Sequence, residues 1–140
     1  MTAGEKSAVS VIAALVVVGV GYIHNVLGMA EAGEALTMAS LRGSVIMAVI
    51  ASVVIIVAGH IAIGIVDFKE IDFTDERDRL ITLKVGRNAG AVQGFTLALA
   101  ILGFLIEMQP VVLFHVVWAG LVISELVGAG SRFMLYRRGV

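Results

Sequence analysis

The sequence has no cysteine and only one proline, and just 15% of its 140 residues are charged. The absence of cysteine excludes disulfides, thiolate metal sites and cysteine nucleophiles. Soluble domains carry about 25% charged and about 45–50% apolar residues, whereas 59% of this chain is hydrophobic and its mean hydropathy is +1.02. A net charge of −1 without a basic, aromatic-studded patch argues against nucleic-acid binding. The composition is that of an integral membrane protein.

Four apolar stretches are long enough to cross a bilayer, which needs about 20 residues of helix. They cover about residues 7–27, 41–66, 88–108 and 111–131. Because Pro110 lies between the third and fourth stretches, where a helix start needs no amide donor, we expect these two to form a tight helical hairpin. The sequence therefore predicts an all-α fold: a four-helix transmembrane bundle that is a single domain over residues 1–140.

The basic residues predict the orientation, because Lys and Arg concentrate on the cytoplasmic side of membrane proteins. If the N-terminus is cytoplasmic, Arg42 is the only basic residue on the outer side. The other nine then share the inner side: Lys6, Lys69, Arg77, Arg79, Lys84, Arg87, Arg132, Arg137 and Arg138. We therefore predict that both termini lie in the cytoplasm.

The longest polar stretch, residues 67–87, separates the second and third spans. Thr74 is a good N-cap and acidic residues follow it, so we expect a helix that begins at Asp75 and continues through the third span. Its charged positions are Asp75, Glu76, Arg77, Asp78, Arg79, Lys84 and Arg87. One interpretation is a docking surface for lipid headgroups or a protein partner. The alternative is a solvated helix that merely follows the positive-inside rule.

The segment Asp75-Glu76-Arg77-Asp78-Arg79-Leu80-Ile81-Thr82-Leu83-Lys84 resembles a known signature, Asp-Glu-Arg-(Asp/Glu)-x-x-Ile-x-x-(Lys/Arg). That signature belongs to a family of small, uncharacterised prokaryotic membrane proteins, a domain of unknown function with two spans on each side of the motif. The resemblance implies the four-span plan and the cytoplasmic membrane of a prokaryote. Members are often encoded beside small helix-turn-helix regulators, which implies a regulatory or accessory role.

Small residues recur every four positions in the last two spans. The third span carries Gly86, Gly90 and Gly94, and the fourth carries Gly120, Ser124 and Gly128. Such rows let helix backbones approach closely in lipid. One interpretation is that the two spans pack on each other, and the other is that a row forms a homo-oligomer interface.

Ionisable and amide side chains inside the spans form two predicted layers. His60, Gln93 and Glu125 each lie six or seven residues from the inner end of their span, so they share a depth of about 9–10 Å. Intramembrane acids usually serve a function, and a proton could pass between Glu125 and His60. Alternatively, the three side chains form a structural network that fixes helix register.

The outer layer contains His24, Glu107 and His115. Two histidines and a carboxylate suit a metal ion, and two histidines on different helices suit haem. Their spacing matches no metal motif, and polar side chains are also common at the headgroup level. No nucleophile elbow, P-loop or zinc-protease motif occurs.

These observations predict a non-enzymatic accessory or regulatory membrane protein without a cofactor, forming homo-oligomers and docking a partner or lipid through residues 75–87. Two alternatives stay open. The first is an oligomeric proton- or cation-coupled transporter or channel that uses Glu125 and His60. The second is haem or metal binding by His24 and His115.

Overall fold

The structure, a computed structural model, describes residues 2–66 and 76–138. These residues form four α-helices: α1 (Ala3–Glu31), α2 (Met38–Val66), α3 (Glu76–Leu105) and α4 (Pro110–Arg138). All four are long and apolar enough to cross a membrane. The prediction of an all-α chain with four such helices is confirmed. Thr74 and Asp75 lie outside the described residues, and the described part of the charged segment continues without a break into the third span.

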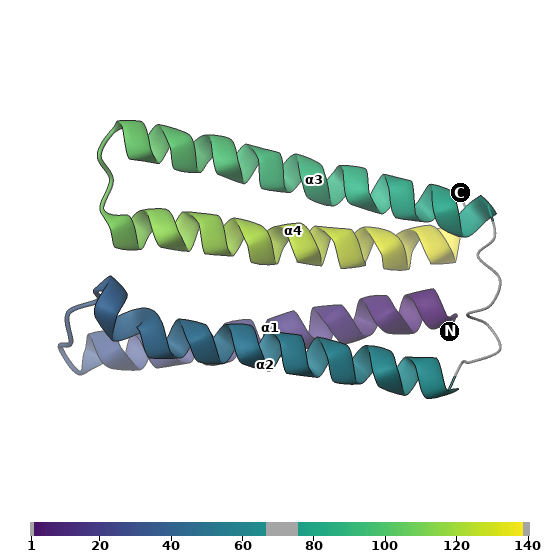
Figure 1. The fold of residues 1–140 in the computed structure, drawn as a ribbon, viewed down its shortest axis with the longest axis horizontal. Coiled ribbons are helices and arrows are strands. Elements are labelled where there is room, and N and C mark those ends of the chain that lie inside the picture. The colour runs from purple at the N-terminus through teal and green to yellow at the C-terminus, as the bar shows by residue number, and fades with distance from the viewer. Residues whose placement is uncertain (1, 67–75, 139–140) are drawn as a thin grey trace.

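The helices pack in the spatial order α2, α1, α4, α3, so that α1 and α4 form the central pair (Figure 1). Only small parts of the outer helices are buried, and α2 buries just Leu41 and Ala48. Most large apolar side chains on α2 point outward, including Met47, Val54 and Ile61. An apolar exterior of this extent is stable in lipid, where it faces hydrocarbon, and would be an aggregation site in water.

The two described connections, from α1 to α2 and from α3 to α4, begin with the same helix-ending motif. At the end of α1, the amide of Glu34 donates to Met29 O and that of Gly33 to Ala30 O. At the end of α3, the amides of Met108 and Glu107 donate to Gly103 O and Phe104 O. The motif needs a left-handed residue, supplied by Gly33 (φ 75°) and Glu107 (φ 55°). The third span was predicted to reach residue 108, but this motif ends α3 at Leu105.

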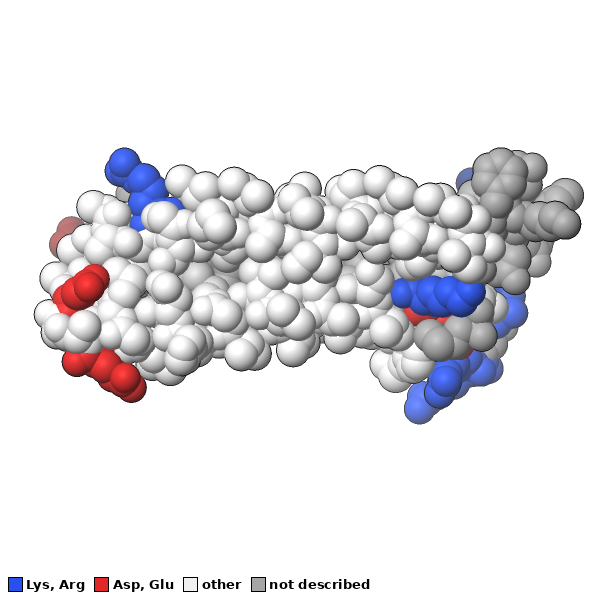
Figure 2. Space-filling model, turned by 90° about the horizontal axis from the view of Figure 1, so that it is seen from below, with Lys and Arg blue, Asp and Glu red and all other residues white. Residues whose placement is uncertain are grey.

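Charge separates along the long axis of the molecule (Figure 2). The start of α1 and the end of α4 lie at one end, where the basic residues of α3 and α4 gather, and glutamates occupy the other end (Figures 1 and 2). We call these the basic end and the acidic end. Arg42, in the second turn of α2, is a basic residue at the acidic end. The positive-inside rule assigns the basic end to the cytoplasm, and this assignment stays a prediction.

Candidate polar cavity at the basic end

A cavity of about 300 Å³ lies in the half of the bundle nearer the basic end, and residues of all four helices line it. Its polar lining consists of Ser7 from α1, His60 from α2, and Glu125 and Arg132 from α4. The α3 wall is formed by Val85 and Ala89. A cavity of this volume with several polar groups has room for ordered water. It is the candidate functional site.

Both ring nitrogens of His60 lie within hydrogen-bond distance of a partner. Nδ1 lies 2.8 Å from Ile56 O, and since a carbonyl oxygen only accepts, Nδ1 carries the proton. Nε2 lies 2.9 Å from Ser7 Oγ, a hydroxyl that can either donate or accept. Both ring nitrogens therefore have hydrogen-bond partners, yet the side chain stays exposed. The approach of α2 to α1 here depends on Gly59, because the Ser10 hydroxyl occupies the space of a Cβ at that position.

Glu125 is placed by the residues beside it on α4. Ser124 and Gly128 are buried against α3, which turns Glu125 away from that interface and into the cavity. The Glu125 side chain is exposed and makes no hydrogen bond or ion pair with another described residue. Arg132 lines the same cavity two helical turns further along, about 10 Å in rise. The carboxyl group of Glu125, the imidazole of His60 and the guanidinium of Arg132 thus line the same cavity.

The predicted inner layer is only partly brought together. His60 and Glu125 line the cavity, whereas Gln93 is half-buried on α3 and is not among the described residues that line it. Within the described ranges no hydrogen bond joins the three side chains. Sequence reasoning did not place Ser7 or Arg132 beside His60 and Glu125. Arg132 follows Glu125 by seven residues, which puts both on one face of α4, and this spacing was the signal that could have joined them.

The two small-residue rows have different surroundings. On α4, the space of a Cβ at Gly120 is filled by the Thr96 side chain, and Ser124 Oγ donates to Ala89 O at 2.9 Å. This row therefore packs on α3. A Cβ at Gly86, Gly90 or Gly94 would meet nothing within 4 Å. The α3 row faces away from the described part of the chain.

The residues of the predicted outer layer have different surroundings. His115 Nδ1 donates to Val111 O at 2.7 Å, and Nε2 lies 2.9 Å from the Tyr22 hydroxyl, so both nitrogens have hydrogen-bond partners. His24 is exposed, and Glu107 lies in the turn after α3. Across residues 2–66 and 76–138, no three His, Asp or Glu side chains come together as metal ligands.

His115 instead belongs to a cluster of rings between α1 and α4. The Tyr22 ring, 5% exposed, lies 4.3 Å from that of Trp118 and 6.1 Å from that of His115. Phe114 packs edge-on against His115, with 5.4 Å between centroids. These ring contacts pack α1 against α4.

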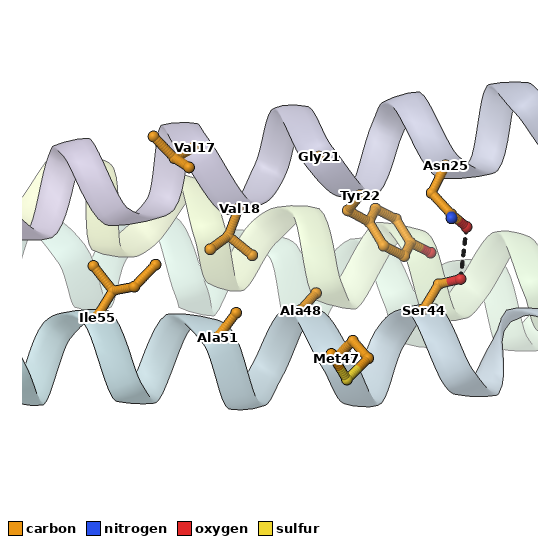
Figure 3. A pocket seen from close by; sticks show the side chains of 10 residues that line it. All are labelled: Val17, Val18, Gly21, Tyr22, Asn25, Ser44, Met47, Ala48, Ala51 and Ile55. Atoms are coloured by element: carbon orange, nitrogen blue, oxygen red, sulfur yellow. Dashed lines mark hydrogen bonds between the residues drawn. The ribbon is translucent and has the colours of Figure 1, made fainter.

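A second and mostly apolar cavity, about 350 Å³, lies between α1 and α2 (Figure 3). Valine, alanine and isoleucine side chains form most of its walls. Its polar end is closed by the hydrogen bond from Ser44 Oγ to Asn25 Oδ1, at 2.7 Å. The α1–α2 pair is thus held by side-chain hydrogen bonds near its ends and is loosely packed between them.

The charged start of α3 is fastened to the end of α4. Arg77 donates to Tyr136 O at 3.1 Å, and the Tyr136 hydroxyl donates to Asp78 at 2.9 Å. Arg77 and Asp78, two residues of the charged segment, therefore both have a hydrogen-bond partner on α4. Glu76, Arg79 and Arg87 are exposed and Lys84 is half-buried. Sequence spacing did not reveal Tyr136 as the partner of Arg77 and Asp78.

Comparison of the chain with family models, curated proteins and solved structures finds no match. The resemblance to the four-span family stays a prediction.

Proposed function

We propose that the protein is a non-enzymatic, multi-pass protein of a prokaryotic cytoplasmic membrane that carries a proton, or a small cation coupled to one, through the polar cavity. The observation that supports this proposal is the shared cavity of His60, Glu125 and Arg132, lined by all four helices. An exposed carboxylate within a span costs a few kcal/mol unless water or a partner compensates, and such residues mark ion pathways.

The hydrogen bonds of His60 suit proton exchange. When the ring is neutral with its proton on Nδ1, Nε2 carries the lone pair and accepts the hydrogen bond from the Ser7 hydroxyl. When Nε2 takes a proton, the Ser7 hydroxyl can turn and accept, because a hydroxyl both donates and accepts. Glu125, reached through cavity water, is the proton donor in this scheme. Arg132 then stabilises the carboxylate that remains.

The test is proton flux into liposomes that contain the reconstituted protein and an entrapped pH-sensitive dye, driven by a potassium diffusion potential. We expect flux above that of protein-free liposomes, and we expect Glu125→Gln and His60→Asn to abolish the excess. Glu107→Gln is the matched control, because it neutralises a carboxylate at the acidic end, outside the cavity. Wild-type flux equal to that of empty liposomes, or full flux in Glu125→Gln, contradicts the proposal.

A second function is favoured by the free cations at the basic end. Arg79, Lys84 and Arg87 make no hydrogen bond or ion pair with another described residue, whereas Arg77 does. They form the surface on which an acidic protein partner would dock. We expect a partner to copurify in nanodiscs cut from native membranes and to be lost when all three become Gln. Retention in that variant, compared with Arg138→Gln by native mass spectrometry, contradicts docking.

A further inference from the structure

Arg42 has an unusual environment for a basic residue in this chain. It lies at the acidic end, in the second turn of α2, about 6 Å in rise from the helix start. Its side chain is exposed and has no hydrogen bond or ion pair to any described residue, although Glu31, Glu34 and Glu107 lie at the same end. An unpaired guanidinium at that depth requires an anion or extension to the headgroup layer.

A groove of about 190 Å³ runs beside Arg42. Four apolar residues of α2 form one wall and the Phe114 ring of α4 forms the other. The α2 wall consists of Met38, Leu41, Val45 and Ile46. Leu41 is fully buried and forms a fixed floor, whereas Ile46 is half exposed toward the lipid. Arg42 is the only charged residue that lines the groove in the described ranges.

We propose that this groove binds one anionic glycerophospholipid of the leaflet at the acidic end. The guanidinium holds the lipid phosphate through paired hydrogen bonds, a geometry that Arg offers and Lys does not. The first part of an acyl chain lies along Ile46 and Phe114. The order of groups fits this ligand, because the cation stands beside an apolar groove that continues toward the hydrocarbon. A soluble phosphate would use the cation and leave the groove empty. This site is separate from the polar cavity and does not depend on its function.

The experiment measures lipid retention on the full chain, in detergent, by native mass spectrometry after titration with phosphatidylglycerol or phosphatidylcholine of equal chain length. We expect wild type to retain one phosphatidylglycerol about tenfold more tightly, as a charge-assisted pair implies. Arg42→Gln should reduce retention to the phosphatidylcholine level. Arg138→Gln, which removes an exposed cation at the basic end, is the matched control and should retain the lipid.

Two further variants separate groove from charge. Phe114→Ala keeps the cation and removes a wall, and should weaken retention of the anionic lipid. Arg42→Lys is used in case the glutamine variant does not fold. It should weaken retention about threefold, because an ammonium group cannot form the paired hydrogen bonds of a guanidinium. Three results overturn the proposal: unchanged retention in both Arg42 variants, an equal loss in Arg138→Gln, or displacement of the lipid by millimolar inorganic phosphate.

Discussion

His60 and His115 make the same pair of hydrogen bonds in opposite halves of the bundle, yet their surroundings differ. In each ring Nδ1 donates to the carbonyl four residues earlier, and Nε2 accepts a hydroxyl from α1. His115 is packed against the rings of Tyr22 and Phe114. His60 is exposed and shares its cavity with Glu125 and Arg132. The same local chemistry thus serves as a structural link in one half and as an accessible base in the other.

α4 carries a member of both sites, His115 and Glu125, so its packing on α3 should matter to both. Gly120→Leu should give the largest effect, a loss of about 2–3 kcal/mol of stability, because Thr96 already fills the space beside Gly120. Unfolding in detergent, followed through the fluorescence of Trp118, the chain's only tryptophan, measures it.

Gly90→Leu is the control on α3, where a Cβ meets nothing within 4 Å. It should change stability by less than about 0.5 kcal/mol. If that variant alters only the oligomer mass, the α3 row is the homo-oligomer interface predicted from its glycines. Equal destabilisation by both variants would contradict the packing described for α4.

Removing the hydroxyl partner of each histidine tests the comparison directly. Tyr22→Phe leaves His115 Nε2 without its donor in a packed cluster, and should lower the free energy of unfolding by about 1–2 kcal/mol. Ser7→Ala should lower it by less than about 0.5 kcal/mol, because cavity water can replace the hydroxyl on His60. Far-UV circular dichroism during denaturation avoids the fluorescence change that Tyr22→Phe causes at Trp118. An equal loss in the two variants would show that the His60 site is as dry as the His115 site.

The turn after α3 leads into α4, which carries His115 and Glu125, and a change there should have a smaller effect than Gly120→Leu. Glu107 adopts φ 55°, a conformation unfavourable for a residue with a Cβ. Glu107→Gly should therefore raise the free energy of unfolding by about 1 kcal/mol. A thermal denaturation experiment should show this as a higher midpoint. Gly33→Ala, at the equivalent position after α1, should lower stability by a similar amount. A neutral result for Gly33→Ala would contradict the shared helix-ending motif.

Length and hydropathy by themselves determined the four helices, because a long apolar helix satisfies its own backbone hydrogen bonds in lipid. The sequence determined the helix ends less well. Glu107 looks like the end of the third span in the sequence, but the hydrogen bonds of the turn show that α3 ends before it, at Leu105. Depth counting brought His60 and Glu125 to one level, since rise per residue is fixed.

Only tertiary structure decided which side chains at one level meet. Gln93 was predicted at the depth of His60 and Glu125, but it is not among the described residues that line the cavity. His115 resembled a ligand until Tyr22, 93 residues away in sequence, was found on its free nitrogen. Likewise, two similar glycine rows differ because α4 presents its row to α3 whereas α3 presents another face. Helix rotation and neighbour choice depend on side-chain fit between distant segments, and in lipid no difference in hydrophobicity specifies them in the sequence.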